Sequence, residues 1–468
     1  MTQLYRDLPV TILGLGSFGG GVAAARFLAE HGARVTITDL KPESELAESL
    51  AALAHVPIER LALGGHPPAV FEACRLLVVN PAVPPNHPGI ATAAAAGAEI
   101  TTEIEIFLRH NQGRVIGITG SNGKSTTSAL THHLLCQSGL SSWLGGNIGV
   151  SLLPQLAQIQ PTDLVVLELS SFQLELLRHR RFRPEIAVLT NFSQNHLDWH
   201  GTLDAYRLAK QSIFSAQLST DISLIPASEE QLGCTGSEWR IRGQRHEFGT
   251  ADSGSDGAFV EAGSLILRTS HGRFEDSLQL SIPPQLPGEH NACNIAAAAA
   301  AAWLAGANPQ TFAKALQAWR PLPHRLQCVA DRAGRQFWND SIATTPESAI
   351  AALKHMSGRA VILAGGYDKG QDLQSFADAI CQHSLGVVLM GQTALALKQR
   401  IEASAAGPAP SLAVASDFPT AFQLAVAMSA PGDIVLLSPG CASYGWFRDY
   451  RDRGDQFTRM AQEWSPLP

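Results

Sequence analysis

The chain has 468 residues, of which 45% are hydrophobic and 16% charged, so it is expected to form a folded protein of about three domains. A formal net charge of −7 argues against broad binding of nucleic acid or of anionic membranes, and we expect neither as a partner. Seven cysteines without a Cys-x-x-Cys pair, and a start without a signal pattern, favour a cytoplasmic protein. We expect it to be a monomer.

Short apolar runs alternate with helix-length segments along most of the chain, an order typical of α/β folds with parallel sheets. Polar, Gly/Ser-rich sequence around 215–285 predicts a small antiparallel addition to the central domain. Polar residues and prolines near 109–112 and 320–323 predict domains at 1–109, 110–321 and 322–468. The expected strands are 10–13, 35–38, 76–79, 115–118, 164–167, 186–189, 360–363, 386–389 and 434–437.

The first strand runs into Gly14-Leu15-Gly16-Ser17-Phe18-Gly19, and Asp39 ends the second strand. This spacing is that of a dinucleotide-binding turn, and a nicotinamide-dependent dehydrogenase is one hypothesis. The same turn holds any pyrophosphate at a helix N-terminus, and a dehydrogenase would not need the second glycine motif downstream. We therefore expect a nucleotide that is not redox-active.

That second motif is Gly120-Ser121-Asn122-Gly123-Lys124-Ser125-Thr126, which follows the expected strand at 115–118. Backbone N–H groups of such a turn converge on phosphate oxygens, and the next helix adds its positive end. Lys124 is expected to reach the terminal phosphates of a nucleoside triphosphate, and Ser125 to bind Mg²⁺. Only two residues separate Gly120 from Gly123, which is shorter than the usual P-loop.

Ionisable residues follow the next strands. Glu168 ends the strand at 164–167, at the sheet edge where ligands bind, and could hold Mg²⁺ together with Ser125. His196 lies on the following loop and could bind a second cation or a phosphate, although a lone loop histidine is usually only a surface residue. Lys210 lies in a helical stretch, where an exposed lysine is the ordinary interpretation.

Later loops repeat this pattern. Asn291 and Asn294 open a helix and could face a nucleotide. Arg325 lies at the second predicted domain boundary and could reach a γ-phosphate. Asp340 and the loops at 365–369 and 437–443 each follow an expected strand. Together they predict a third binding surface at one sheet edge.

The whole set of motifs resembles the Mur ligases, in the same order and over essentially the whole chain. The motifs that carry the resemblance are 119–126, Gly145-Gly146-Asn147-Ile148-Gly149, Leu167-Glu168-Leu169-Ser170-Ser171-Phe172-Gln173-Leu174-Glu175, His290-Asn291, Pro323-His324-Arg325, Asn339-Asp340-Ser341 and Leu437-Ser438-Pro439. The resemblance implies three domains: an N-terminal Rossmann-like domain, a central P-loop ATP-binding domain with a parallel sheet, and a Rossmann-like C-terminal domain for the incoming amino acid.

By the same resemblance, the activity would be ATP-dependent addition of D-glutamate to UDP-N-acetylmuramoyl-L-alanine through an acyl phosphate, in peptidoglycan precursor synthesis. ATP and two Mg²⁺ ions are implied. Ligation of L-glutamate instead stays open, because Ile342 stands where a lysine often follows Asp-Ser in this family. A ligase resembling folylpolyglutamate synthase is a further alternative, although such a protein would lack the N-terminal glycine turn.

The resemblance also assigns residues. The UDP-substrate site would comprise Gly14, Leu15, Gly16, Ser17, Asp39, Asn80 and Asn147, and the ATP site Gly120, Ser121, Asn122, Gly123, Lys124, Ser125, Thr126, Asn291, Asn294, Arg325 and Asp340. Metal ligands would be Ser125, Glu168, His196 and a carbamylated Lys210, and the catalytic set Lys124, Glu168, His196 and Lys210. Glutamate would be bound by Thr344, Lys369, Ser443 and the backbone of Tyr450.

Overall fold

A computed structural model describes residues 2–16, 19–178, 180, 182–269, 276–280, 286, 288–320, 322–356, 358–368, 373–407 and 410–465. The chain divides into two compact units, Met1–Trp319 and Arg320–Pro468. The first unit contains two sheets and the second contains one. Within the described ranges, no helix is long and apolar enough to cross a membrane.

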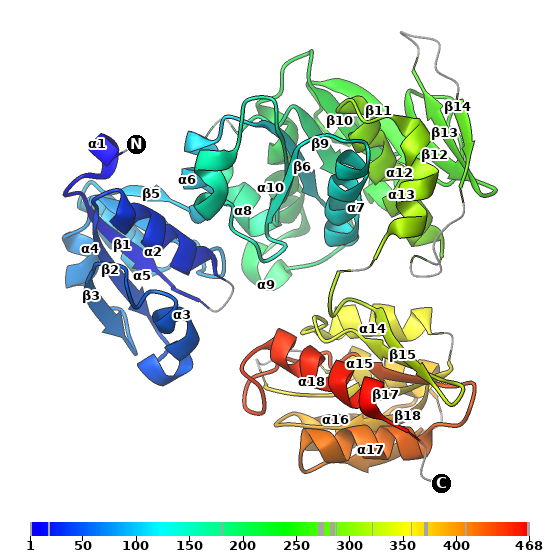
Figure 1. Cartoon of the computed structure of the whole chain (residues 1–468). Coiled ribbons are helices and arrows are strands. Elements are labelled where there is room, and N and C mark those ends of the chain that lie inside the picture. The colour runs from blue at the N-terminus through cyan, green and yellow to red at the C-terminus, as the bar shows by residue number, and fades with distance from the viewer. Residues whose placement is uncertain are drawn as a thin grey trace. The chain divides into compact units, whose positions relative to one another are not determined.

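The first sheet has five parallel strands in the order β3-β2-β1-β4-β5. Helices α2 and α6 pack on one face and α4 and α5 on the other, so apolar residues fill both sides (Figure 1). The strands are β1 (Pro9–Leu13), β2 (Arg34–Asp39), β3 (Ile58–Leu63), β4 (Leu76–Val79) and β5 (Glu99–Thr101). The helices are α1 (Thr2–Tyr5), α2 (Gly20–Glu30), η1 (Glu43–Glu45), α3 (Ala47–Ala51), α4 (Ala69–Glu72), α5 (Pro88–Ala95) and α6 (Glu103–His110).

The second sheet has nine strands in the order β14-β13-β12-β11-β10-β9-β6-β8-β7. In the sheet order, the strands from β7 to β12 pair in parallel, and β12, β13 and β14 pair antiparallel. An antiparallel addition is therefore confirmed for its later strands, whereas β10 and β11, which also lie within the predicted 215–285 region, extend the parallel sheet. The strands are β6 (Arg114–Thr119), β7 (Ser142–Gly146), β8 (Leu164–Glu168), β9 (Ile186–Leu189), β10 (Ile222–Pro226), β11 (Gln244–Gly249), β12 (Gly257–Glu261), β13 (Ser264–Arg268) and β14 (Asp276–Gln279).

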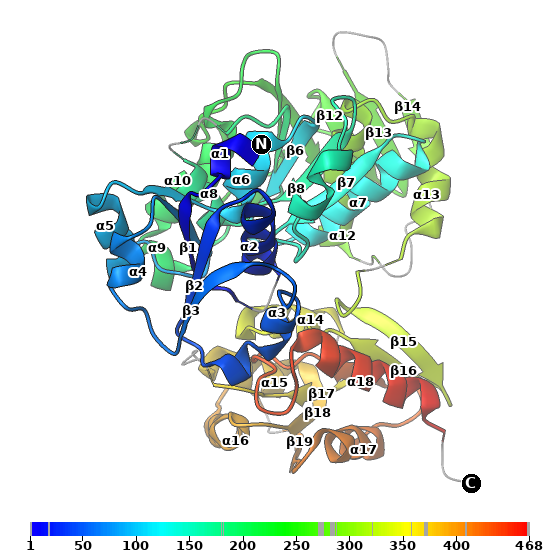
Figure 2. The same ribbon diagram turned by 60° about the vertical axis from the view of Figure 1, so that its left-hand side comes forward.

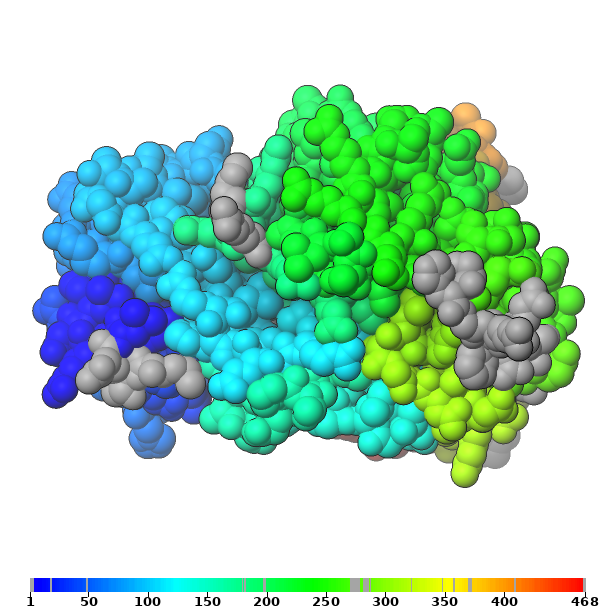
Figure 3. All heavy atoms as spheres, turned by 90° about the horizontal axis from the view of Figure 1, so that it is seen from above, coloured from blue at the N-terminus to red at the C-terminus, as the bar shows by residue number. Residues whose placement is uncertain are grey.

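Helix α7 contacts both α12 and α13 beside this sheet, and α8 and α10 form a second contacting pair (Figure 1). Residues around 200–260, green in Figure 3, form much of the surface of this unit in that view. The helices are α7 (Lys124–Gln137), η2 (Leu153–Gln158), α8 (Ser171–Leu177), α9 (Leu197–His200), α10 (Leu203–Ser215), α11 (Glu229–Leu232), η3 (Gly236–Glu238), α12 (Glu289–Leu304), η4 (Pro309–Thr311) and α13 (Phe312–Ala318).

The run of alanines in α12 allows this helix to be buried between its neighbours. Residues 296–302 are at most 1% exposed, because α12 lies between α7 and the strands β9 to β12. A methyl side chain at each position lets the helix approach neighbours on every side, and alanine has the highest helix propensity. This packing places the first turn of α12 next to the first turn of α7.

The second unit contains a six-stranded sheet in the order β15-β16-β20-β17-β18-β19, parallel except for the pair β15 and β16. Its two faces carry separate apolar clusters, one covered by α14, α15 and α16 and the other by α17 and α18. The predicted α/β class with three sheets is therefore confirmed. The strands are β15 (Gln327–Arg332), β16 (Arg335–Asn339), β17 (Ala360–Ala364), β18 (Ser384–Leu389), β19 (Ser411–Val414) and β20 (Ile434–Leu437). The helices are α14 (Pro346–His355), α15 (Gln374–His383), α16 (Ala394–Ala403), α17 (Phe418–Met428) and α18 (Tyr450–Glu463).

Candidate active site

The glycine-rich turn between β6 and α7 forms the predicted phosphate cradle. Gly123 has φ +79° and caps α7, and Gly120 has φ +156°. A Cβ atom on Gly120 would lie 1.8 Å from Thr190 Oγ1, and one on Gly123 would lie 2.3 Å from Asn294 Oδ1. Glycine is therefore required here by close neighbours as well as by the backbone conformation.

The loop after β9 holds the cradle in shape. Asn122 N donates to Asn191 Oδ1 at 2.9 Å. Ser121 Oγ donates to Ser193 O at 2.9 Å and lies 3.0 Å from the hydroxyl oxygen of Tyr206, which is fully buried. Hydrogen bonds from two other segments thus fix the backbone whose N–H groups would face a phosphate.

Two lysines converge on the cradle. Lys124 Nζ donates to Gly120 O at 2.9 Å and to Ser121 O at 3.0 Å, and Lys210 Nζ donates to the same Gly120 O at 2.7 Å. Lys210 is only 1% exposed. Burial, and then the charge of Lys124, lower the pKa of Lys210 well below its ordinary value, against the opposing effect of Glu168. A buried lysine of this kind is favoured as a neutral amine.

Glu168 supplies a buried carboxylate at the same sheet edge, because β8 pairs with β6 in the register Ile118 to Glu168. Its Oε1 accepts a hydrogen bond from Asn147 Nδ2 at 2.7 Å. Its Oε2 is buried and has no hydrogen-bond partner among the described residues. An unsatisfied carboxylate oxygen in a buried site is what a cation would complete, and Ser125 lies buried in the first turn of α7.

The predicted asparagines of α12 lie behind the cradle. Thr127 Oγ1 donates to Asn294 Oδ1 at 3.3 Å, and Asn294 Nδ2 donates to Asn291 Oδ1 at 3.2 Å. The predicted histidine, His196, has φ +54° and lies on the loop after β9, with its ring 6.0 Å from that of Tyr206. The structure thus gathers the predicted catalytic residues of the first unit around one turn.

The N-terminal glycine turn forms a second cluster, at the carboxyl edge of the first sheet. Gly14 and Gly16 have φ +83° and +66°. Asp39 Oδ2 accepts from Gly16 N at 3.2 Å, and Asn80 Nδ2 donates to Gly14 O at 3.2 Å. The Leu15 side chain is buried, so only its backbone is available to a ligand. Asn147, predicted for the same UDP-substrate site, donates to Glu168 Oε1 at 2.7 Å.

In the second unit, Asp340 follows β16 and is buried. Its Oδ2 accepts from Ser438 Oγ at 2.7 Å and its Oδ1 from Leu326 N at 3.1 Å. Burial raises the pKa of Asp340 to about 7, although the charge of Arg325 opposes this. Arg325 Nε is itself buried and has no hydrogen-bond partner in the described ranges.

Arg453 of α18 holds two loops of this unit together. Its guanidinium donates to Ser341 Oγ at 2.9 Å, to Ser341 O at 2.8 Å and to Cys441 O at 3.1 Å. Ser341 Oγ in turn donates to Tyr450 O at 2.7 Å. Arg453 is fully buried, and this burial lowers the pKa of its guanidinium to about 9.

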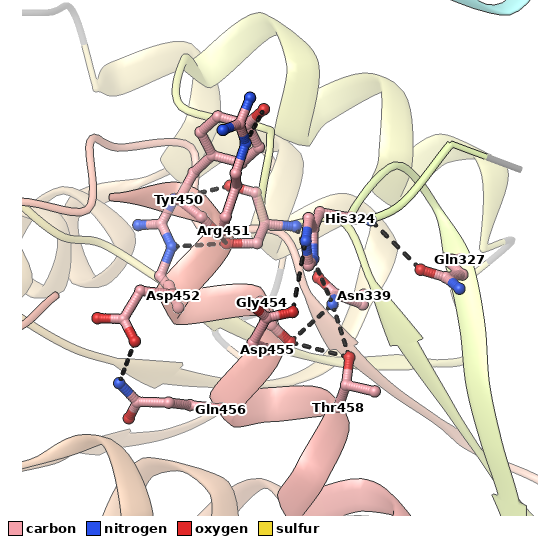
Figure 4. A network of polar contacts seen from close by, with 12 residues as sticks. His324, Gln327, Asn339, Tyr450, Arg451, Asp452, Gly454, Asp455, Gln456 and Thr458 are labelled. Atoms are coloured by element: carbon pink, nitrogen blue, oxygen red, sulfur yellow. Dashed lines mark hydrogen bonds and ion pairs between the residues drawn. The ribbon is translucent and has the colours of Figure 1, made fainter. Parts of the chain in front are cut away.

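His324 lies beside this cluster and contacts the start of α18 (Figure 4). Asn339 Nδ2 lies 3.1 Å from His324 Nδ1 and donates to Gly454 O at 2.9 Å and to Thr458 Oγ1 at 3.0 Å. His324 Nε2 lies 3.6 Å from a carboxylate oxygen of Asp455. The loop before β15 is thereby attached to α18.

The residues predicted for glutamate lie on three segments of this unit. Thr344 follows Ile342, to whose carbonyl its N–H donates at 2.8 Å, and Ser443 is buried on the loop after β20. Tyr450 begins α18. Lys369, predicted for the same site, lies outside the described residues, as does Ser17 of the N-terminal turn.

Two residues that support these sites, Tyr206 and Arg453, were not predicted from the sequence. Tyr206 lies four residues before Lys210 on α10, a spacing that places both side chains on one helix face. That spacing was the available signal for Tyr206. An arginine on a terminal helix gave no comparable signal, because such residues are usually solvated.

Three family models match the chain. The N-terminal domain of MurD-like Mur ligases matches residues 9–102, the Mur ligase middle domain matches 118–302, and the glutamate ligase domain of Mur ligases matches 324–441. The chain belongs to the Mur ligase family. The phosphate cradle, Glu168 and Lys210 all lie within the match to the middle domain.

Curated relatives of this Mur ligase extend over nearly its whole length. A UDP-N-acetylmuramoylalanine–D-glutamate ligase of Roseiflexus sp. (strain RS-1) is 39% identical and covers 97% of this chain and 98% of its own. A ligase of the same name from Geobacillus kaustophilus (strain HTA426) is 37% identical with the same coverage. The solved structure of UDP-N-acetylmuramate-alanine ligase MurC from Thermotoga maritima is similar in fold, with a TM-score of 0.62, 20% identity, and coverage of 97% and 99% of the two chains. MurF ligase from Thermotoga maritima, in complex with ADP, gives a TM-score of 0.55 at 16% identity, with coverage of 99% and 97%.

Proposed function

We propose that this Mur ligase joins D-glutamate to UDP-N-acetylmuramoyl-L-alanine at the expense of ATP, as a MurD-type enzyme of peptidoglycan precursor synthesis. The names of relatives that match nearly the whole chain support this assignment. The observation that carries it is the grouping of a buried carboxylate, Glu168, and a buried amine, Lys210, around a Gly-Lys-Ser turn. That grouping suits phosphoryl transfer to an anionic substrate.

The chemistry follows from the weakness of a carboxylate as an electrophile. The γ-phosphoryl group of ATP passes to an oxygen of the L-alanyl carboxylate, which gives ADP and an acyl phosphate. The glutamate amine then attacks the acyl carbon, the C–O bond to phosphate breaks, and the amine loses a proton. Two anions must meet in the first step, and Lys124 with the positive end of α7 would offset their repulsion.

A divalent cation fits the residues present. Ser125 and Glu168 would hold one Mg²⁺, because Glu168 Oε2 is buried and no described residue donates to it. His196 and Lys210 would serve a second ion if Lys210 is carbamylated, since a carbamate replaces a cation with an oxygen ligand. The Lys210 amine suits that reaction, because a neutral amine attacks CO₂. When bound, Mg²⁺ would supply positive charge to the phosphate oxygens.

We further propose that the functional domains span 1–109, 110–321 and 322–468. The ATP site would use Asn291, Asn294, Arg325 and Asp340 besides the cradle, and the glutamate site Thr344, Lys369, Ser443 and the backbone of Tyr450. The UDP-substrate site would use Gly14, Leu15, Gly16, Ser17, Asp39 and Asn80. Asn147 would belong to the UDP-substrate site as well, and its amide also holds Glu168.

One assay tests the function. Phosphate release is measured with ATP and UDP-N-acetylmuramoyl-L-alanine in the presence of D-glutamate, L-glutamate or no amino acid. We expect D-glutamate to stimulate release strongly and to appear in the product. Stimulation by L-glutamate alone would favour the alternative acceptor, and no stimulation by either would contradict the proposal.

A further inference from the structure

Arg325 lies on a short loop whose backbone is held in an unfavourable conformation. The residues on either side of it, His324 and Leu326, have φ +63° and +39°, in the left-handed region that side chains disfavour. Neither residue is a glycine, so the surroundings must hold the loop in this conformation. The contacts that hold it therefore determine where the Arg325 side chain begins.

The backbone of this loop is anchored on both sides of its arginine. His324 N donates to Gln327 Oε1 at 3.3 Å, and His324 O accepts from Ile342 N at 3.1 Å. Leu326 N donates to Asp340 Oδ1 at 3.1 Å. Ile342 and Asp340 both belong to the segment directly after β16, so the position of the loop depends on that segment.

The side chain of Asn339, the last residue of β16, connects this segment to helix α18, which runs alongside β15 and β16 (Figure 2). Asn339 Oδ1 accepts from Ser341 N at 3.1 Å, and its Nδ2 donates to Gly454 O at 2.9 Å. These two bonds fix the orientation of the amide, because the reversed amide would oppose donor to donor and acceptor to acceptor. Nδ2 also lies 3.1 Å from His324 Nδ1. An amide nitrogen offers only hydrogens, so His324 Nδ1 is the acceptor.

The ring of His324 is therefore neutral in this contact. Because Nδ1 is an acceptor, the hydrogen is on Nε2, which lies 3.6 Å from a carboxylate oxygen of Asp455. Burial, the largest effect, lowers the pKa of His324, and Arg451 acts in the same direction, whereas Asp455 and Asp449 oppose it. These three charged residues belong to α18 and its N-cap.

Gly454 lets α18 approach this contact closely. A Cβ atom on Gly454 would lie 2.3 Å from His324 Nδ1 and 3.0 Å from Asn339 Nδ2. Gly454 and Asn339 are both buried. His324 is thus confined by the backbone of the helix and bound by Asn339, and Arg325 follows it directly in the chain.

We propose that Asn339 is a positioning residue of the reaction, which clamps His324 against α18 and thereby aims Arg325 at the γ-phosphate of ATP. This inference rests on the proposed function. Asn339 is fully buried, so it acts through its neighbours. Its oxygen fixes the turn that carries Asp340 and its nitrogen holds the loop that carries Arg325, so one amide sets the relative position of two residues proposed for ATP. A small misplacement of a charge that stabilises the transition state is costly.

Replacing Asn339 by aspartate removes only the donor side of its amide. The carboxylate of Asn339→Asp can still accept from Ser341 N, but it turns an oxygen toward His324 Nδ1. Asn111→Asp is the matched control, because Asn111 Oδ1 accepts from Gly113 N at 3.1 Å and its Nδ2 donates to Gly113 O at 2.8 Å. Asn111 thus also binds the N–H two residues later and a backbone carbonyl, and it belongs to none of the proposed sites.

A double-mutant cycle with Arg325 tests the positioning role, with phosphate release by the full chain as the readout and circular dichroism as the check on folding. Asn339→Asp and Arg325→Ala should each lower kcat by at least about 30-fold. The double variant should be within about 3-fold of Arg325→Ala alone, because Asn339 acts through Arg325. Asn111→Asp should stay within about 3-fold of the wild type. Effects that multiply in the double variant, or a wild-type kcat for Asn339→Asp, would overturn the inference.

Gly454→Ala gives the same cycle a second entry that leaves Asn339 unchanged, for use if Asn339→Asp does not fold. Alanine is favoured in a helix, but its methyl group displaces the ring of His324. We expect a lowered kcat that does not fall further when Arg325→Ala is added. A further fall, or a wild-type kcat, would again overturn the positioning role.

Titration of His324 by NMR of the histidine-labelled full chain tests the clamp without turnover, with His324→Gln to assign the signal. A carboxylate at position 339 needs a donor at Nδ1, so the affinity of His324 for a proton should rise by at least about 10-fold in Asn339→Asp. It should not change in Asn111→Asp. An unchanged affinity in Asn339→Asp would overturn the clamp.

The wild type separates this result from the function itself. If D-glutamate stimulates its phosphate release but the effects in the cycle multiply, only the positioning role fails. If the wild type shows no release that depends on D-glutamate, the proposed function fails and the positioning role fails with it.

Discussion

Lys210 Nζ and the carbonyl oxygen of Gly120 lie 2.7 Å apart, which joins helix α10 directly to the phosphate cradle. The amine is buried, lies 4.7 Å from the centre of the Tyr206 ring and shares its acceptor with Lys124. Two ammonium groups on one carbonyl would repel each other, so the buried one is the group that gives up its proton. The lysine that looked ordinary in the sequence is thus a buried amine with a lowered pKa.

The first prediction concerns this amine. Lys210→Ala should lower kcat by at least about 100-fold, because the second cation would lose a ligand. A short-chain carboxylate such as acetate should restore part of the activity, since it can replace the carbamate. Lys124→Ala is the matched control: it should be equally inactive, and acetate should not rescue it, because its missing group is a cation. Equal rescue of both variants, or rescue of neither, would contradict the carbamate role.

The second prediction concerns Tyr206, whose hydroxyl lies 3.0 Å from Ser121 Oγ inside the cradle. Tyr206→Phe removes this bond and should lower kcat, raise KM for ATP, and cost about 1 kcal/mol of unfolding free energy. Tyr5→Phe is a suitable control, since Tyr5 is also buried and its hydroxyl lies 2.8 Å from His110 Nε2, away from the cradle. Denaturant unfolding and steady-state kinetics are measured for both variants. Equal kinetic effects would show that Tyr206 does not position the cradle.

Much of the fold was predictable because buried parallel strands are continuous apolar runs. All nine expected strands are present, including β1, β6 and β17. Two of the strands that were not expected carry charges or glycines: β3 reads IERLAL and β7 reads SWLGG. β3 forms one edge of the first sheet and β7 one edge of the second, where one side of the strand has no partner and the apolar signal is weak.

The candidate site was predictable only where a motif marks a turn. The cradle and Glu168 follow strands directly, and the structure places them at one edge. The burial of Lys210 depends on how α10 packs beside β6 and β9, and no local pattern encodes that packing. The contact of Asn147 with Glu168 likewise depends on the pairing of β7 with β8.

The third prediction separates backbone strain from steric conflict at the cradle. Gly123 and Gly139 flank α7, with φ +79° and +82°. Alanine at either position should cost about 1–2 kcal/mol, because side chains disfavour this conformation. Only Gly123→Ala places a Cβ 2.3 Å from Asn294 Oδ1, whereas nothing lies within 4 Å of a Cβ on Gly139. Gly123→Ala should therefore abolish ATP turnover, and Gly139→Ala should retain it. Phosphate-release kinetics and thermal unfolding check both, and an active Gly123→Ala would contradict the cradle geometry.

The last prediction uses the pH dependence of stability at Asp340. Its pKa is about 7 in the folded chain and about 4 when unfolded, so the folded state binds the proton more tightly. The contribution of Asp340 is therefore most favourable below pH 4, and it is lost progressively as the pH rises from about 4 to about 7. Asp340→Asn cannot ionise and keeps an oxygen for Leu326 N, so it should lack this loss. Measured by calorimetry, the Tm of Asp340→Asn minus the Tm of the wild type should therefore increase between pH 5 and pH 8. Titration of His324 and the other groups is common to both proteins and cancels in the difference. A difference that does not change with pH would show that Asp340 is ionised in the folded chain throughout this range.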